Sequence, residues 1–248
     1  MAVETKLPVA NKIFQNKNEM MRTIYFYVIL ILTSFFSLSI AAQSTESPKD
    51  IKVLKETKDK HGNTVRVIQY KKGNSVVTET LITPPFPGVN ERPKVNIDTL
   101  NQDSLMVLVD KTNYLVAIIY KRQRIRQYKA VFGPDRLEDK KMEGDRMTPE
   151  GWFKVVSKRN HKNWQRFILL DYPNHHSYEN FRKHKSNGVI PSNARIGGSI
   201  GFHGTLKSTA EMIDYGIGWT DGCIALKPED IEDLYLFLQP GTRVYVRR

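Results

Sequence analysis

The sequence predicts a mainly β domain, built as a β sandwich or barrel with one or two short helices. Its apolar residues fall in short runs that are rich in Val and Ile and end at Gly, Pro or Asn, as strands joined by turns do. Only residues 228–238 have apolar side chains at clear helical spacing. Many short strands with few helices are typical of sandwiches and barrels.

An apolar segment near the start predicts an export signal over residues 1–42. Residues 24–40 read IYFYVILILTSFFSLSI, with Lys17 and Arg22 before them and small residues after them. A basic start, an apolar centre and a small-residue end are typical of a secretory signal peptide. The alternative is an uncleaved membrane anchor, although the run is shorter than the ~20 residues that usually span a bilayer. We expect an exported protein of the periplasm or cell envelope, tethered through residues 24–40 if the segment is retained.

Residues 43–103 are interpreted as an N-terminal extension. Short runs containing Val between positions 52 and 83 are separated by turn sequences at 61–63 and 72–74, which indicates a small β hairpin element. Several breakers then predict a linker, namely Pro84, Pro85, Pro87, Gly88 and Pro93.

The main domain, residues 104–248, begins with a predicted hairpin of residues 105–110 and 114–120 and a third strand at 125–132. Further strands are predicted at 151–156, 167–171, 195–203 and 244–246. A helix is predicted from Pro228, which suits a first helical position, to the stop at Pro240-Gly241. Shorter helices are expected near 208–215 and, within a long basic loop at 172–194, near 178–185. A loop of that length is usually functional or mobile.

The chain carries a strong positive charge. Its formal charge is +12, and removal of residues 1–42 takes away four basic and two acidic side chains, which leaves +10. In an exported protein such a charge suits cell wall, a lipid surface or an acidic glycan. No basic stripe interleaved with aromatics is present, so nucleic acid is not an expected partner.

The single cysteine of the chain, Cys223, lies in a glycine-flanked turn twenty residues after His203. A lone thiol with a candidate base elsewhere is the sequence pattern of a cysteine nucleophile. One cysteine cannot form an internal disulfide, and a lone thiol in an oxidising compartment is exposed to oxidation. The alternative interpretation is a small buried core residue.

Three segments in order resemble the L,D-transpeptidase catalytic domain of the YkuD type. They are Gly144-Asp145-Arg146-Met147-Thr148-Pro149-Glu150-Gly151, the strand ending in Phe202-His203-Gly204, and Thr220-Asp221-Gly222-Cys223-Ile224. The resemblance covers residues 104–248 and implies the β sandwich or barrel of that family.

The resemblance implies roles for the matching residues. Cys223 is the expected nucleophile, His203 its base and later the acid, and the Gly204 carbonyl orients the ring. Backbone amides around Gly222 and Cys223 form the expected oxyanion hole. An imidazole beside the thiol can take its proton and leave a thiolate–imidazolium pair.

The positions beside the nucleophile depart from the family pattern. Asp221 replaces a frequent histidine, and Ala225 stands where Arg or Asn is frequent. Asp221 and Thr220 are candidates for orienting His203 or the turn, and a turn cap is the favoured interpretation of Asp221. An arginine is a natural clamp for a substrate carboxylate, so Arg195 and Arg146 are the candidate substrate-binding residues.

The resemblance also implies the substrate and the reaction. Peptidoglycan stem peptides are the expected substrate, cut between the diamino acid at position three and D-alanine at position four. Transfer to an amine acceptor gives a 3→3 cross-link, a step of peptidoglycan biosynthesis and cell-wall organisation that affects cell shape. Carbapenem β-lactams are expected to acylate Cys223. We expect a monomer without a cofactor or metal.

Two alternatives to this transferase stay open. The departures at Asp221 and Ala225 favour a hydrolase of the same fold, a cysteine peptidase or amidase acting on wall cross-links or wall-attached proteins. A non-catalytic wall-binding domain is the other alternative. His175, His176 and His184 suggest a metal weakly, because no ligand has matching spacing, and a surface loop is favoured. His61 and His161 are interpreted as surface residues, and Trp152 and Trp164 as packing residues.

Overall fold

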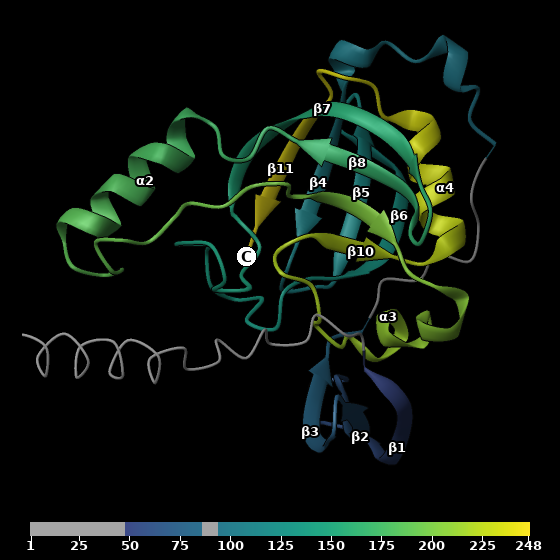
Figure 1. The fold of residues 1–248 in the computed structure, drawn as a ribbon. Coiled ribbons are helices and arrows are strands. Elements are labelled where there is room, and N and C mark those ends of the chain that lie inside the picture. The colour runs from purple at the N-terminus through teal and green to yellow at the C-terminus, as the bar shows by residue number, and fades with distance from the viewer. Residues whose placement is uncertain (1–47, 86–93) are drawn as a thin grey trace, which may run out of the picture. The chain divides into compact units, whose positions relative to one another are not determined.

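The structure, a computed structural model, describes residues 48–85 and 94–248. Eight strands of the second range close into a barrel in the order β10-β6-β5-β4-β11-β7-β8-β9 (Figure 1). The barrel strands are β4 (Leu105–Asp110), β5 (Leu115–Tyr120), β6 (Gln123–Val131), β7 (Gly151–His161), β8 (Gln165–Leu170), β9 (Gly201–Gly204), β10 (Ile224–Leu226) and β11 (Arg243–Arg247).

The barrel forms because its strands carry one apolar face. Along β4 buried residues alternate with half-buried ones, as the two-residue period of a strand requires. β4, β5 and β6 follow as antiparallel neighbours, and β11 returns parallel to β4. Inward side chains such as Val107, Val116, Tyr128 and Phe153 form one continuous core, and burial of each stabilises the fold by about 1.5–3 kcal/mol. This core fixes β9 and β10, which carry the candidate site.

Three α-helices accompany the strands in the described part of the chain, in the three regions where the sequence predicts a helix, and the predicted mainly β fold is confirmed. α4 (Pro228–Phe237) buries Ile231, Leu234 and Phe237 in the barrel core. Its first position is a proline and two acidic residues follow, which suits the positive end of the helix dipole. α2 (His175–Ser186) buries no residue and extends away from the barrel (Figure 1). α3 (Glu211–Tyr215) follows a 3-10 turn at Lys207–Thr209.

The segment before His203 differs from its prediction. A strand was expected over 195–203, but the observed strand β9 spans only Gly201–Gly204. The backbone φ angles of Gly197 and Ser199 are +76° and +57°, a left-handed conformation that departs from the extended backbone of a regular strand. A Cβ at Gly201 would lie 2.3 Å from the Ile168 carbonyl oxygen, so glycine lets β9 approach β8 closely.

Two further strands differ in length from the prediction. β7 continues to His161 because β8 pairs with it along that length. The turn sequence after Cys223 forms β10, which pairs parallel with β9 and antiparallel with β6. A strand of only three residues is too short for its pattern to be recognised in sequence.

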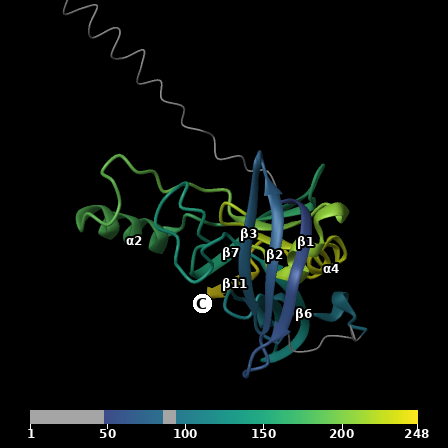
Figure 2. The same cartoon turned by 90° about the horizontal axis from the view of Figure 1, so that it is seen from below.

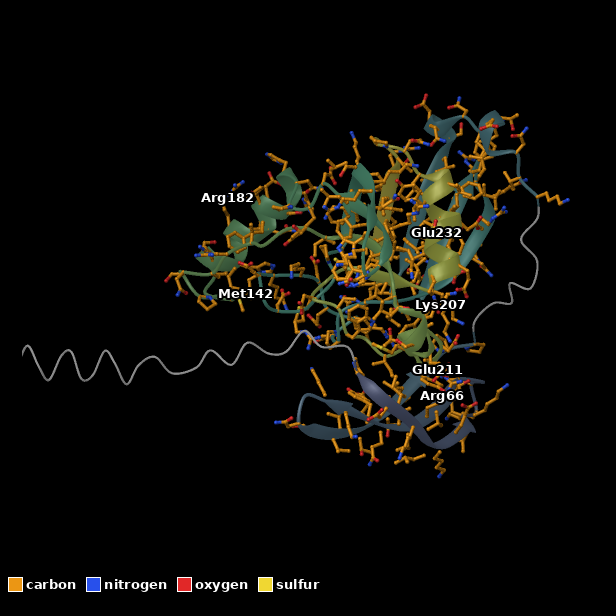
Figure 3. All side chains as sticks on the ribbon, turned by 45° about the vertical axis from the view of Figure 1, so that its right-hand side comes forward. Arg66, Met142, Arg182, Lys207, Glu211 and Glu232 are labelled. Atoms are coloured by element: carbon orange, nitrogen blue, oxygen red, sulfur yellow. The ribbon has the colours of Figure 1, made fainter. Side chains whose placement is uncertain are left out.

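The residues before the barrel form a separate antiparallel sheet, which we call the accessory sheet. Its strands are β1 (Lys49–Lys58), β2 (Thr64–Lys72) and β3 (Ser75–Thr83), and they run side by side (Figure 2). The two predicted turns join these three strands. Ile68 and Tyr70 of β2 form a second buried cluster with Met212 of α3 and Ile217. Figure 3 labels Arg66 on β2 and Glu211 on α3, the two elements that meet there.

The predicted signal or anchor segment, residues 24–40, lies outside the described residues. Among residues 48–85 and 94–248, no helix has the length and apolarity needed to cross a membrane.

Candidate active site

Strand register brings His203 and Cys223 to one face of the barrel. In the parallel pair of β9 and β10, Ala225 lies opposite His203. Side chains two residues apart on a strand share a face, so Cys223 lies on the same side as His203, one diagonal step away.

The His203 ring is held on three sides. Its Nδ1 lies 2.8 Å from the Gly204 carbonyl oxygen, the contact that the resemblance implied. A carbonyl only accepts hydrogen bonds, so Nδ1 carries the proton and Nε2 keeps its lone pair. Trp164 stacks on the ring with centroids 4.5 Å apart, and Trp219 meets it edge-on at 5.5 Å. Nε2 of a buried, oriented imidazole is therefore the basic atom of the site.

Burial makes His203 a neutral side chain at pH 7. The residue is 2% exposed, and loss of water lowers its pKa to about 4, although the Gly204 hydrogen bond opposes that shift. The charge of His161 lowers the pKa further. His161 was expected at the surface, but its ring stacks on Trp164 at 4.3 Å, so it belongs to the aromatic group beside His203.

The Cys223 thiol is also neutral in this site. It is partly exposed, and its Sγ donates to the Ser199 carbonyl oxygen at 3.5 Å. Burial raises the pKa of Cys223 to about 11, while the Gly201 N–H and the Lys140 charge oppose the rise. Together with the low pKa of His203, this favours thiol and neutral imidazole at rest. The expected thiolate–imidazolium pair is thus not the favoured resting state.

The turn before Cys223 is closed by its own side chains. The Thr220 hydroxyl donates to the Cys223 carbonyl oxygen at 2.7 Å and accepts from the Gly222 N–H at 3.3 Å. Gly222 has a φ of +127°, and a Cβ there would lie 2.6 Å from the Met147 carbonyl oxygen. Because the Gly222 N–H points at Thr220, the Cys223 N–H is the better candidate of the two expected oxyanion donors.

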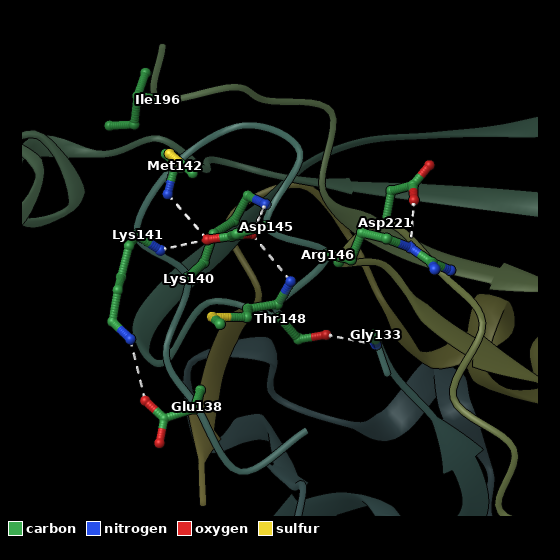
Figure 4. A network of polar contacts seen from close by, with 12 residues as sticks. Gly133, Glu138, Lys140, Lys141, Met142, Asp145, Arg146, Thr148, Ile196 and Asp221 are labelled. Carbon is green, nitrogen blue, oxygen red and sulfur yellow. Dashed lines mark hydrogen bonds and ion pairs between the residues drawn. The ribbon is translucent and has the colours of Figure 1, made fainter. Parts of the chain in front are cut away.

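A buried ion pair underlies this turn. Lys140 Nζ and Asp145 Oδ1 are 2.7 Å apart, with side chains 3% and 6% exposed. Asp145 also accepts from the backbone N–H groups of Lys141, Met142 and Met147, as Figure 4 shows. Burial alone would raise the pKa of Asp145, but these hydrogen bonds outweigh it and lower the pKa. A Cβ at Gly222 would lie 3.6 Å from Lys140 Nζ, so the ammonium group lies directly beneath the turn.

The two arginines expected to bind substrate have different surroundings. Arg146 donates from Nε to Asp221 at 3.1 Å (Figure 4). Its Nη2 donates to the Trp219 carbonyl oxygen at 2.7 Å. Asp221 thus pairs with Arg146 and not with His203. Arg195 is exposed, and its backbone oxygen accepts from the Glu143 N–H. Of the two, Arg195 keeps an exposed guanidinium, whereas Arg146 joins the loop at 138–149 to the turn before Cys223.

His175, His176 and His184 lie on α2, and His61 is exposed in the turn between β1 and β2. His175 and His176 each face Glu179, at 3.6 and 3.7 Å. Within the described ranges, no group of three or more His, Cys, Asp or Glu side chains is arranged to hold a metal ion.

Sequence reasoning missed four residues of this site. Trp164 was interpreted as a packing residue, while Trp219, Lys140 and Ser199 were not singled out. Trp219 directly precedes the nucleophile turn, and Lys140 lies five residues before Asp145. Trp219 carries a sequence signal, because it adjoins the nucleophile turn. Trp164, Lys140 and Ser199 carry none, because strand pairing and loop closure bring them to the site.

Comparison with known proteins identifies the family. The L,D-transpeptidase catalytic domain family, YkuD, matches residues 104–246. This match covers more than half of the chain, so the chain belongs to the L,D-transpeptidase catalytic domain family, and the predicted resemblance is confirmed. No curated protein matches the chain in the corresponding sequence search.

Solved structures show similar folds at low sequence identity. An L,D-transpeptidase from Xylanimonas cellulosilytica DSM 15894 is 16% identical over 58% of this chain and 60% of that one, with a TM-score of 0.38. One from Stackebrandtia nassauensis is 20% identical over 62% of each chain, also at 0.38. LdtMt1, solved in complex with imipenem, is 15% identical over 79% of this chain and 81% of its own, at 0.36. The chain spans about three fifths of the first two structures.

Proposed function

We propose that this protein is an exported cysteine L,D-transpeptidase that acts on peptidoglycan stem peptides. The observation that carries the proposal is the placement of Cys223 on the same barrel face as His203, whose Nδ1 is held by the Gly204 carbonyl. Family membership supports a transpeptidase role. The apolar run at 24–40 and the net charge of +12 support export to the cell envelope.

The first half of the proposed reaction forms a thioester. With a thiol pKa of about 11, the thiolate fraction at pH 7 is on the order of 10⁻⁴, so a base must act during attack. His203 Nε2 takes the thiol proton while Sγ attacks the carbonyl carbon of the donor peptide bond. The Cys223 N–H stabilises the oxyanion, and such a donor contributes roughly 3 kcal/mol. The C–N bond then breaks, and the imidazolium returns its proton to the departing amine of D-alanine.

The second half transfers the acyl group. An acceptor amine attacks the thioester carbonyl, His203 takes a proton from that amine, and the C–S bond breaks to regenerate the thiol. Attack by water in place of the amine gives hydrolysis. How well the site excludes water decides between transfer and hydrolysis. The engagement of Arg146 with Asp221 and Trp219 and the alanine at position 225 keep hydrolysis as the second candidate function, since neither residue is a free clamp for the acceptor.

The test uses the full chain with disaccharide-tetrapeptide muropeptides, and mass spectrometry identifies the products. We expect 3→3 dimers and free D-alanine from the wild type and neither from Cys223→Ala. D-alanine release without dimers at any acceptor concentration would establish the hydrolase. A folded wild type that gives no product, with equal wall binding by wild type and Cys223→Ala, would establish the non-catalytic alternative.

Inhibition provides an independent check of the nucleophile. A carbapenem should add its mass once to the wild-type chain, because a thiol can open the β-lactam ring and form an acyl-enzyme. Cys223→Ala should stay at its own mass under the same conditions. An adduct on Cys223→Ala would refute the assignment of the nucleophile.

A further inference from the structure

The accessory sheet lies outside residues 104–246, the part of the chain that defines the family. The residues that pack on it nevertheless connect it to His203 and Cys223. Ile68 is 0% and Tyr70 8% exposed, and they form one buried cluster with Met212 and Ile217, which are 0% and 1% exposed. The apolar face of β2 is thus covered by the segment that leads from α3 to the nucleophile turn.

Trp219 connects this cluster to the barrel. The indole packs against both the cluster of Ile68 and Tyr70 and the barrel core. It also meets the His203 ring edge-on, with centroids 5.5 Å apart. Its Nε1 is buried and makes no hydrogen bond to the described residues. Apolar packing therefore sets where the indole lies, and Ile68 and Tyr70 of the accessory sheet belong to the cluster that it packs against.

The backbone between α3 and Trp219 is fixed to the accessory sheet as well. Gly216 has a φ of +73°, and a Cβ there would lie 2.7 Å from Thr83 Cγ2 of β3. Arg66 of β2 donates to the Thr83 hydroxyl at 3.2 Å, and its guanidinium lies 5.6 Å from the centre of the Tyr215 ring. The Trp219 carbonyl oxygen then accepts from Arg146. Side chain and backbone of Trp219 are thus held from two directions.

We propose that the accessory sheet is a positioning element of the active site: Ile68 and Tyr70 hold Trp219 against His203 and so keep water from the imidazole. The proposal rests on the proposed function only in taking His203 as the base. Trp164 covers the other face of the ring. The titratable neighbours are His161 at the end of β7, whose charge acts on His203, and the Cys223 thiol before β10. Neither residue belongs to the accessory sheet. A substitution in the accessory sheet therefore reaches His203 through Trp219.

The test compares variants of the full chain by the acid limb of their pH–rate profiles in the transfer assay. Ile68→Ala should let Trp219 move and admit water to the ring. A hydrated imidazole regains its proton more easily, so the acid limb should move up by about one pH unit. Trp219→Ala should move it in the same direction. Because the proposal has Ile68 act on His203 only through Trp219, the double variant should move the limb no further than Trp219→Ala alone.

Val76→Ala is the matched control, because Val76 lies on the same sheet and is 62% exposed; its profile should match the wild type. Tyr70→Leu, which keeps an apolar side chain, should move the limb in the same direction if Ile68→Ala does not fold. Histidine titration by NMR should report the same shift at His203 without turnover. Folded Ile68→Ala or Tyr70→Leu with the wild-type acid limb, or additive shifts in the double variant, would overturn the proposal. An inactive wild type would instead count against the proposed function, and the NMR titration would still decide this proposal.

Discussion

Replacement of Asp145 by asparagine tests whether the buried ion pair beneath the nucleophile turn organises the loop at 138–149. Asp145 Oδ1 accepts from Lys140 Nζ and the Met147 N–H, while Oδ2 accepts from the N–H groups of Lys141 and Met142. Asparagine has one oxygen and one NH₂ group. In either orientation its NH₂ group faces two donors, so two of the four hydrogen bonds are lost.

The expected cost follows from burial. The side chains of Lys140 and Asp145 are 3% and 6% exposed, and removal of one partner from a buried pair costs about 3–5 kcal/mol, because the other charge is left without compensation. We therefore expect Asp145→Asn to lower the free energy of unfolding by about that amount. Urea unfolding at pH 7, followed by circular dichroism, measures it.

The control for Asp145→Asn is a partly exposed pair of the same loop. Lys141 Nζ lies 3.2 Å from Glu138, with side chains 31% and 47% exposed, and solvent screening leaves such a pair with little effect on stability. Glu138→Gln should therefore leave unfolding nearly unchanged. If Asp145→Asn costs no more than Glu138→Gln, the four hydrogen bonds do not stabilise the loop and the reasoning is wrong.

Three further predictions concern the catalytic pair and its turn. Alkylation of Cys223 by iodoacetamide should accelerate about tenfold per pH unit from pH 7 to 10, because burial raises the thiol pKa to about 11; a plateau below pH 8 would show a thiolate–imidazolium pair instead. The wild type should lose about 3 kcal/mol of unfolding free energy between pH 6.5 and 4, because folded His203, with its pKa lowered to about 4, stays neutral while the unfolded chain is protonated. His203→Phe should not show that part of the loss in urea titrations at several pH values. Gly222→Ala should reduce transfer activity at least tenfold, since its Cβ would lie 2.6 Å from the Met147 carbonyl oxygen at a φ of +127°. Gly241→Ala, also at positive φ but with nothing within 4 Å, is the control, and equal activity of the two variants would contradict the prediction.

The sequence predicted those parts of the fold that have a local signal. Pro228 and the two acids after it mark the start of α4, and the apolar run at 105–110 before a turn sequence marks β4, because both signals depend on neighbours in the chain. β10 has three residues and forms only through pairing with β6 and β9. The strand expected at 195–203 was too long because the positive φ angles at Gly197 and Ser199 arise from tertiary contacts. Gly197 packs against Glu143, and Ser199 faces the Cys223 thiol.

The sequence suggests candidate reacting residues but not the residues that surround them. His203, Gly204 and Cys223 are predicted from motifs whose residues are consecutive, and the contact of His203 with the Gly204 carbonyl is observed. Lys140 and Trp164 come from distant loops, and no spacing rule connects them to Cys223. The protonation state was also beyond sequence reasoning, because it depends on how far each group is removed from water. Asp221 illustrates the limit, since its partner Arg146 lies 75 positions away.

The barrel closes at β10, the strand that directly follows Cys223, and we call this closure the seam. β10 completes the ring through two residue pairs with β6 and three with β9, and these same pairs place the strand of His203 beside the strand that follows Cys223. A chain in which this seam is still open has both reactive side chains but no reaction centre. The proposed catalysis therefore depends on closure of the ring, because the pairing of β9 with β10 exists only in the closed barrel.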